Sequence, residues 1–532
     1  MIQSLEEGRK EDGNRSIADK IIKRLHDLDK TIEHNQGRWA WELLQNAKDS
    51  SVNDENHKIS VQIILDNNQV EFKHNGIHFT EKDIRGLINQ ISSKEVEENE
   101  QTRKTGRFGT GFLTTHLLSR IIQIRGILKS ENEQFYRFKF PLDRTGKTML
   151  ELAPMIEKAW SEFHNSVLEV NHNDYNINEF NTSFCYSLIT SEQQEVARTG
   201  IEEFTKLLPY VLAFIPKIKS IQIIDNTRGT DVTFLDKNNR LNEFITLIER
   251  IKNGIKSNIY ILNYSGNKSS IACELEKEND KYFFKNLDNL PKLFCDFPLI
   301  GTENFHFPVI ANSFYFNPLT ERNGVWLKKE NDDEVLENRS ILIESIELYK
   351  ELLPKLLESN YFNFFNIIQT KIPNVDYINK DWFSDEIQTP LRNFIIELNI
   401  VELENDDKKT IKDIWFPSKE YNIERKNNLW QFNYDLSPNS IPKKEHFEKW
   451  TSYSWSDWNF LNYEELVKEI EKIGSIEKIE ESLINKDSYD WLNSVGMFLL
   501  EVESNKLLIK NMQLYLIEME YSIKKVSCLL TK

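Results

Sequence analysis

Apolar and polar residues follow two different periods along the first third of the chain. Apolar side chains recur at helical spacing in several segments, and we predict helices over residues 16–32, 37–51, 80–91 and 112–120. Other segments alternate at period two, and we predict strands over residues 58–65, 69–74, 121–128, 134–140 and 182–189. The first two strands are joined by Asp66-Asn67-Asn68, which is typical of a hairpin. Helices mixed with hairpin-linked strands indicate an α+β fold.

The pattern changes twice further along the chain, and we predict three regions. Residues 1–190 form the first, and residues 191–355 form a middle region with mixed helices and strands. The middle region opens on a helix at 200–214, continues with strands at 218–225 and 230–235, and ends on a long helix at 338–359. Residues 356–532 are less regular, and we expect a helix-rich mixed region. Its aromatic cluster, Trp450 to Trp458, is expected to pack in a core.

Composition narrows the class of protein. The chain has 532 residues, 39% of them hydrophobic and 28% charged, which fits a globular protein. A formal net charge of −17 argues against a chain built mainly to hold nucleic acid. No apolar run approaches the ~20 residues that span a bilayer, and the first residues are not a secretory signal, so we expect a cytoplasmic protein. Cys185, Cys273, Cys295 and Cys528 lack metal-like spacing and are expected to be buried apolar residues.

The predicted helix over 37–51 carries a polar stripe that could form a metal-binding or catalytic site. Glu42, Asn46 and Asp49 stand at i, i+4 and i+7 and therefore share one helix face. An amide oxygen such as that of Asn46 is a suitable ligand for Mg²⁺, and a carboxylate one turn away can deprotonate a water molecule. A solvated helix face is the alternative interpretation.

Two glycine-containing segments follow. His74-Asn75-Gly76-Ile77-His78 ends a strand, where a glycine lets the backbone approach a flat ligand closely. Residues 106–112 read Gly-Arg-Phe-Gly-Thr-Gly-Phe and open a helix, where free N–H groups and the helix dipole favour phosphate. Taken alone, each is equally compatible with an ordinary turn.

The order of these motifs resembles that of the GHKL ATPase superfamily, which includes DNA gyrase B, heat-shock-ninety chaperones and histidine kinases. ELLQNAKDS is similar to the ExxxNxxDA box of that family, and TGRFGTGF is similar to its second glycine box. The segments at 74–84, 105–119 and 305–327 most resemble bacterial sacsin-like ATPases. The resemblance implies a two-layer α/β sandwich over residues 1–190, with ATP and Mg²⁺ as cofactors.

The resemblance also implies roles for single residues. Glu42 is expected to be the general base, Asn46 the Mg²⁺ ligand, and Asp49 a support near adenine and ribose. Gly76 is expected to approach the base closely, with Thr182 beside it on a late strand. The expected phosphate-binding residues are Lys104, Gly106, Phe108, Gly109, Thr110, Gly111 and Phe112. The polar segment 92–105 is expected to be an ATP lid, in which Lys94 and Arg103 are further candidates.

One motif departs from the family. The first glycine box there reads DxGxG, and its aspartate accepts a hydrogen bond from the adenine amino group. Here His74 and His78 replace the aspartate and the second glycine. A neutral imidazole can accept one hydrogen bond, and Asn75 or Asp49 are alternative acceptors.

The resemblance further implies a basic residue from the following region at the γ-phosphate. Arg322, in the turn NPLTERNGVW, is the first candidate and Lys206 the second, with a surface salt bridge as the alternative for each. The expected function is an ATP-hydrolysing conformational switch, acting as a chaperone-like protein or in a bacterial defence system.

Several alternatives stay open. They are a nucleotide-binding module without turnover, a DNA-processing machine of the same superfamily and, least favoured, a histidine kinase. The expected partners are ATP, a second copy of the chain on ATP binding, and an unidentified protein client or defence partner, with no membrane and no nucleic acid. A shifted reading of the final residues can give AIIPNRNGIFYKK, which resembles a segment of larger sacsin-like proteins, so one hypothesis is a truncated or frameshifted form of a longer chain.

Overall fold

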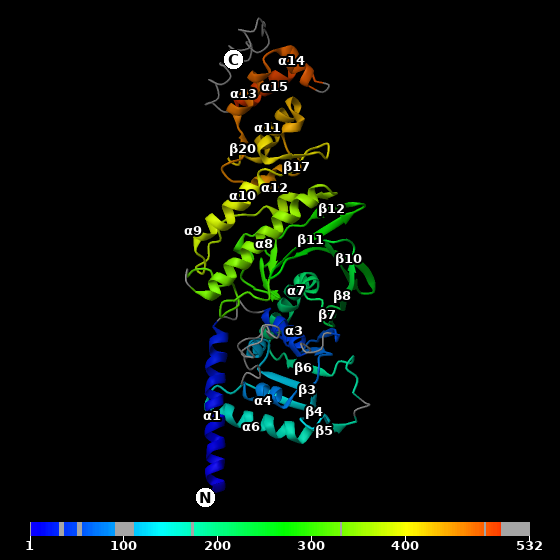
Figure 1. Ribbon diagram of the computed structural model, residues 1–532, viewed down its shortest axis with the longest axis vertical. Coiled ribbons are helices and arrows are strands. Elements are labelled where there is room, and N and C mark those ends of the chain that lie inside the picture. Colours follow the sequence, from blue (N-terminus) through cyan, green and yellow to red (C-terminus); the bar gives the residue numbers. More distant parts are fainter. Residues whose placement is uncertain are drawn as a thin grey trace.

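The computed structural model describes residues 2–30, 37–50, 56–90, 111–171, 175–329, 332–483 and 486–501. This part of the chain is mixed α+β and elongated, with the N-terminal helix at one end and the C-terminal helices at the other (Figure 1). Within these ranges, none of the helices is both long and apolar enough to cross a membrane.

The first part of the chain places helices on one side of a sheet (Figure 1). The helices are α1 (Ile2–Asp29), α3 (Arg38–Ser50), α4 (Glu81–Asn89), α5 (Gly111–Thr114) with a 3-10 turn at Thr115–Leu117, and α6 (Met149–Ser166). The strands are β1 (Ile59–Leu65), β2 (Gln69–His74), β3 (Ile121–Lys129), β4 (Phe135–Asp143), β5 (Leu168–Val170) and β6 (Thr182–Ser187).

The middle part begins with a long helix and continues the sheet. The helices are α7 (Ser191–Phe214), a 3-10 turn at Glu303–Phe305, and α8 (Asp333–Leu357). The strands are β7 (Ile218–Asp225), β8 (Thr230–Arg240), β9 (Ile245–Lys252), β10 (Ile255–Ser265), β11 (Ser270–Glu278), β12 (Lys281–Phe284), β13 (Leu293–Cys295), β14 (Phe297–Pro298) and β15 (Ile310–Asn312).

The last part is mostly helical, with short strands. The helices are α9 (Lys380–Trp382), a π-helix at Phe383–Gln388, α10 (Thr389–Ile395), α11 (Ile423–Leu436), α12 (Phe447–Tyr453), α13 (Tyr463–Ile473), α14 (Ile476–Ser482) and α15 (Ser488–Leu500). The 3-10 turns are Phe364–Ile367, Ile411–Asp413 and Pro438–Ser440. The strands are β16 (Tyr361–Phe362), β17 (Asn399–Glu402), β18 (Lys408–Thr410), β19 (Trp415–Pro417) and β20 (Asn459–Leu461).

One sheet joins the first two parts. Its strand order is β14-β13-β15-β11-β10-β9-β8-β7-β1-β2-β6-β3-β4-β5, with β12 and β16 at the side. The link between the parts is the parallel pair β1–β7, in which Ile63 lies beside Ile223. The sheet therefore runs without interruption past residue 190, and the predicted division at that residue stays a prediction. The second predicted division, at residue 355, falls inside α8.

Sequence signals account for the element boundaries that position the site. The burial pattern of β1 alternates at every residue, as the period-two run predicts. The hairpin from β1 to β2 is confirmed, with Leu65 opposite Val70. Thr80 begins α4 with a capping box, because its hydroxyl accepts from the Asp83 amide and the Asp83 carboxylate accepts from the Thr80 amide.

Three helices differ from the prediction. Helix α1 begins at Ile2, which is 14 residues before the predicted start at Ser16. The predicted helix over 112–120 is a single turn followed by a 3-10 turn. Helix α7 begins nine residues before the predicted start at Gly200, at a capping box formed by Thr190 and Gln193. In α1 and α7 the added turns are largely polar, so apolar periodicity does not reveal them.

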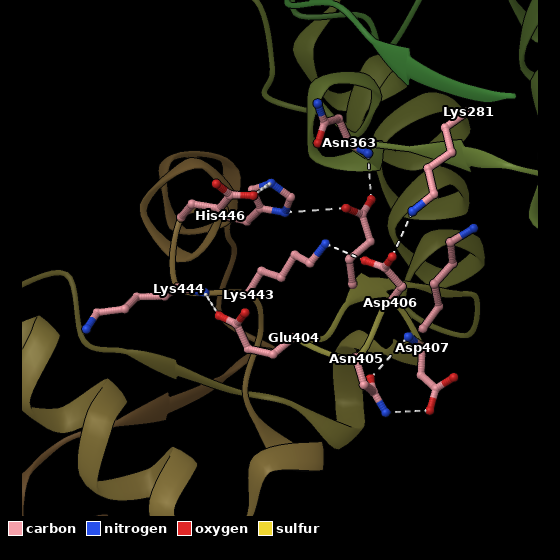
Figure 2. Close-up of polar contacts among 12 residues, drawn as sticks. Lys281, Asn363, Glu404, Asn405, Asp406, Asp407, Lys443, Lys444 and His446 are labelled. Atoms are coloured by element: carbon pink, nitrogen blue, oxygen red, sulfur yellow. Dashed lines mark hydrogen bonds and ion pairs between the residues drawn. The ribbon is translucent and has the colours of Figure 1, made fainter. Parts of the chain in front are cut away.

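Polar contacts fix the last part of the chain to the sheet (Figure 2). Lys281, on β12, and Lys443 both donate to the Asp406 carboxylate, the first at 2.8 Å. Both hydrogen bonds lower the pKa of Asp406, to about 2, and the one from Lys281 has the larger effect. The fully buried Glu402 accepts from the Asn363 amide and lies 3.4 Å from Nδ1 of His446. These charges have protein partners, and we interpret the cluster as structural.

The aromatic cluster at Trp450 to Trp458 packs in the core, as predicted. Trp450 is fully buried, and its ring centre lies 5.9 Å from that of Phe365 and 6.1 Å from that of Trp458. Aromatic rings at such distances stabilise one another beyond the burial of their area. The cluster therefore holds the last part of the chain against the segment that follows α8.

We expect the Trp450→Ala substitution to lower the free energy of unfolding by about 3 to 5 kcal/mol, because it opens a cavity in this core. Urea denaturation followed by circular dichroism measures the change. Trp326→Ala is the matched control, because Trp326 is 39% exposed and its removal should cost about 0.5 kcal/mol or less. Equal effects of the two substitutions would contradict the assignment of Trp450 to the core.

Candidate functional site

Helix α3 positions the polar stripe that the sequence singles out. Trp39, Leu43 and Ala47 are fully buried and anchor the helix on one side. On the adjacent face, Glu42 is 6% exposed and Asp49 is 7% exposed, while Asn46 between them is half-buried. Buried carboxylates require partners, because removing a charge from water is costly. The stripe is therefore not the solvated face that was the alternative interpretation.

The Glu42 carboxylate contacts two residues, Arg38 at the start of α3 and Gly111 at the start of α5. Its carboxylate lies 3.6 Å from the guanidinium of Arg38, one turn earlier on the same helix. It also lies against Gly111, where an added Cβ would collide with the Glu42 carboxylate. This close approach brings the first residue of α5 directly to the predicted general base, and a side chain at residue 111 would push the Glu42 carboxylate aside.

Arg38 links α3 to the turn that carries Arg322. Nη1 of Arg38 donates to the carbonyl of Glu321 at 2.9 Å. Burial lowers the pKa of Arg38, and the charge of Arg322 lowers it further, whereas Glu42 and Glu321 act in the opposite direction. Arg322 is therefore close enough for its charge to act on Arg38, and the structure places it beside the start of α3.

The turn that presents Arg322 has a defined geometry. The Arg322 amide donates to the carbonyl of Leu319 at 2.8 Å, and the Leu319 amide donates to the carbonyl of Gly324 at 2.9 Å. Arg322 itself has a φ of 51°, the left-handed region that is unfavourable for a residue with a Cβ. Backbone conformations of this kind persist where the surrounding structure enforces them, and they cluster at functional sites.

A second contact joins the other end of α3 to the middle part. Lys48 forms an ion pair with Asp296, and both side chains are 13% exposed. The Lys48 ammonium also lies over the ring of Phe314, 5.3 Å from its centre. Burial lowers the pKa of Lys48, but the charges of Asp296 and Asp49 outweigh it and the net change is upward. Both ends of α3 are thus held by the middle part through polar contacts.

The predicted glycine box lies under the last turn of α3. An added Cβ on Gly76 would collide with the Ser50 hydroxyl and with the ring of His74. The Ser50 hydroxyl itself donates to the carbonyl of Ala47 at 2.7 Å. The motif after β2 and the end of α3 are therefore in contact, although residues 51–55 between them lie outside the described residues.

His74 is buried on the face of the sheet that the helices cover. It is 4% exposed and lies opposite Thr182, its partner on β6, which is 1% exposed. Its ring centre lies 6.3 Å from that of Phe184, which in turn lies 5.6 Å from Phe112 on α5. The structure thus brings His74, Thr182 and Phe112 to one layer between sheet and helices.

His74 and Asn75, two of the predicted acceptors for the adenine amino group, already accept hydrogen bonds from backbone amides. Nδ1 of His74 accepts from the Gly76 amide at 3.0 Å. The side-chain oxygen of Asn75 accepts from the Ser60 amide at 2.6 Å, and its nitrogen donates to the carbonyl of Lys58. Burial, and to a smaller extent the charge of His57, lowers the pKa of His74 from its ordinary value of 6.5 to about 3. His74 is therefore neutral near pH 7, and Asn75 supports the end of β2.

Two of the remaining predicted residues, His78 and Lys206, lie in the described part of the chain, and the others lie outside it. His78 contacts Phe135 and Tyr175 at the far end of the box, and burial lowers its pKa. Lys206 lies on α7, where its charge acts on Glu203. The residues that lie outside the described part of the chain are Lys94, Arg103, Lys104, Gly106, Phe108, Gly109 and Thr110.

Sequence reasoning missed three residues of this site. Arg38 and Glu42 form an i,i+4 pair of opposite charge, a signal that was available in the sequence. Lys48 reaches a carboxylate 248 residues away, and Ser50 covers a glycine in another motif. No local pattern identifies these last two contacts, because they depend on how distant segments fold together.

Oxygen donors of the kind that Mg²⁺ prefers stand on one face of α3. Carboxylate and amide oxygens are the ligands that Mg²⁺ prefers, and it commonly keeps water and phosphate for the rest of its shell. Asn46 supplies one such oxygen between two carboxylates of α3. In the described ranges, no group of three or more His, Cys, Asp or Glu side chains is arranged to hold a metal by protein ligands alone. Comparison with protein-family models and with curated proteins found no match for this chain.

The buried, neutral His74 predicts a pH dependence of stability. The unfolded chain binds this proton near pH 6.5, whereas the folded chain binds it only near pH 3, so stability decreases as the pH falls. We expect this residue to cost about 2 kcal/mol of unfolding free energy between about pH 7 and about pH 5.

The His74→Asn variant isolates this effect, because asparagine keeps an acceptor for the Gly76 amide but does not titrate. Urea denaturation of both proteins at each pH gives the difference in unfolding free energy. As the pH falls, the unfolding free energy of the wild type should decrease more than that of the variant. Parallel pH profiles for the two proteins would contradict the buried, neutral state of His74.

Proposed function

We propose that this protein is an ATP-binding, magnesium-dependent ATPase of the GHKL type, related to bacterial sacsin-like proteins, that acts as a conformational switch. The observation that carries the proposal is the position of Glu42. It is buried at the contact between α3 and Gly111, beside the turn that carries Arg322. A base, a glycine at a helix start and a cation from a later segment are the groups that phosphoryl transfer to water requires.

Glu42 is proposed as the group that accepts a proton from the attacking water. A carboxylate can do this only if its own proton is lost and its position is fixed. The Arg38 guanidinium, 3.6 Å from the carboxylate, restrains its position. Arg38 is therefore a positioning residue that acts through Glu42.

Arg38 and Arg322 together offer positive charge to the terminal phosphate. Two neighbouring guanidinium groups repel each other, and an anion between them relieves the repulsion. Asn46 is the proposed protein ligand of Mg²⁺, which supplies charge neutralisation on the phosphates when it is bound. Phe112 and Thr182 line the layer in which the adenine ring of the nucleotide would lie.

The coupling of the site to the middle part supports a switch. Helix α3 carries the proposed base and metal ligand, and the same helix contacts the middle part through Arg38 and Lys48. A ligand that moves α3 would therefore change contacts at both ends. We propose that this movement changes affinity for a second copy of the chain, or for a protein client or defence partner.

A nucleotide-binding module without turnover is the second candidate. The ion pair between Arg38 and Glu42 favours it, because the carboxylate already has a partner within the protein. Binding without hydrolysis in the wild-type protein would select this candidate.

The Glu42→Ala variant tests the role of the base. We expect ATP hydrolysis to fall by about 100-fold or more, because general-base catalysis contributes factors of about 10² to 10⁴. Nucleotide affinity should stay within about threefold. Phosphate release measures turnover, and isothermal titration calorimetry measures binding.

The Glu42→Gln variant is the companion to Glu42→Ala, since it keeps the shape of the side chain but removes the base, and its turnover should fall as far. Turnover unchanged in Glu42→Ala would remove this residue from the chemistry. Wild-type protein that binds no nucleotide would overturn the proposed function as a whole.

The Arg322→Ala variant tests the cation from the middle part. We expect turnover to fall by about 100-fold with ATP binding retained, because the charge acts on the transition state. The same phosphate-release and calorimetry measurements apply. Arg322→Lys keeps the charge and should recover part of the activity, whereas equal turnover in wild type and Arg322→Ala would assign the residue to structure alone.

A further inference from the structure

Strand β4 presents two basic side chains on the face of the sheet opposite helix α6. On the other face, Phe138 and Phe140 are buried against Phe163 of α6, with ring centres 5.5 and 5.7 Å from its own. Side chains alternate between the two faces of a strand, so Arg137 and Lys139 lie on the face that α6 does not cover. Both side chains are exposed.

The register of the strands adds Arg125 of β3 to this pair. Arg125 is exposed, lies directly opposite Lys139 and is a diagonal neighbour of Arg137. Directly opposed residues have Cβ atoms about 5 Å apart, and diagonal neighbours are about 7 to 8 Å apart. Arg125, Arg137 and Lys139 therefore form one compact group of positive charge, which we call the basic cluster.

The basic cluster lacks acidic partners. Among the residues that the structure describes, none forms an ion pair with the three side chains of the cluster. Acids on the same face are already engaged, since Glu71 lies 3.1 Å from Lys73 and Asp143 accepts from the Thr145 amide at 2.9 Å. Like charges directly opposite each other destabilise a sheet. An anionic group placed over the cluster would relieve this repulsion.

The rest of this face indicates a protein segment rather than a nucleic acid. Leu168 of β5 lies opposite Arg137 and is 68% exposed, so an apolar side chain adjoins the cluster. The outward positions of β3, β4 and β6 carry no exposed aromatic ring of the kind on which single-stranded bases stack. The net charge of −17 also repels a long phosphate backbone, whereas a short acidic segment needs only the local positive field.

We propose that this face binds an acidic segment of a partner protein, with carboxylates over the basic cluster and an apolar side chain against Leu168. Arginine suits this role because its planar guanidinium binds a carboxylate through two parallel hydrogen bonds. The proposal goes beyond the proposed function, because the cluster lies on the face of the sheet opposite α6 and does not require nucleotide binding.

Fluorescence anisotropy with the full chain tests the proposal. The probe is a labelled oligoglutamate peptide with one central leucine. The cluster variant replaces all three residues of the basic cluster with glutamine, and exposed positions of this kind tolerate substitution. The control variant replaces with glutamine three exposed lysines on β7, β9 and β10 of the same sheet, and so changes the net charge equally: Lys219, Lys252 and Lys256.

We expect the cluster variant to bind the probe about tenfold more weakly than the wild type, because three exposed ion pairs are lost. The control variant should stay within about threefold of the wild type. The melting temperature of the cluster variant should equal or exceed that of the wild type, because the like-charge repulsion is removed. A probe with serine in place of leucine should bind the wild type more weakly.

The outcomes are distinct from those for ATP. A loss of affinity confined to the cluster variant supports the proposal. Equal affinities of wild type and cluster variant, equal losses in both variants, or a wild type that does not bind the probe overturns it. Tighter binding of a labelled thymidine oligonucleotide than of the peptide would assign the face to nucleic acid and also overturn it. Failure to bind ATP overturns only the proposed function.

Discussion

The burial of a charged helix between two parts of the chain is the constraint on which the rest of the structure depends. Helix α3 is short, and its apolar side is buried under α7 through contacts such as Trp41 against Phe204, with ring centres 4.4 Å apart. Its polar side cannot face water either, so each charge on it needs a partner. Glu42 has its partner, Arg38, on the same helix, whereas Arg38 and Lys48 also reach the Glu321 carbonyl and Asp296, which fixes α3 against the middle part.

The continuous sheet makes this arrangement possible. Strand β7 pairs with β1 in parallel, and β1 is adjacent to β2, which ends at His74. The middle part is thereby attached to the same sheet that carries His74 and Thr182. A change at α3 is resisted by the sheet on one side and transmitted by Arg38 and Lys48 on the other. Packed interfaces of this kind change between discrete states, which is the property that the proposed switch would use.

The extent of successful prediction follows from how local each signal is. The hairpin of β1 and β2, helix α3 and the start of α4 after Thr80 depend on short segments of sequence, and the structure confirms them. The grouping of Glu42, Asn46 and Asp49 on one face follows from helical spacing alone. The pairing of Lys48 with Asp296 and the contact of Gly76 with Ser50 require the complete fold. The state of the His74 ring likewise depends on a backbone amide whose position the sequence does not reveal.

The parallel pair β1–β7 also determines when the first part of the chain can finish folding. Its two strands are separated by residues 66–217, so during synthesis β1 emerges long before the strand that covers its free edge. At ribosomal rates that interval is on the order of ten seconds. Throughout it, the nascent chain exposes an unpaired edge rich in Ile and Val, a surface that favours aggregation. A strand from the middle part thus closes this edge, and any folding of the first part before residue 217 has been made leaves β1 open to pairing with another chain.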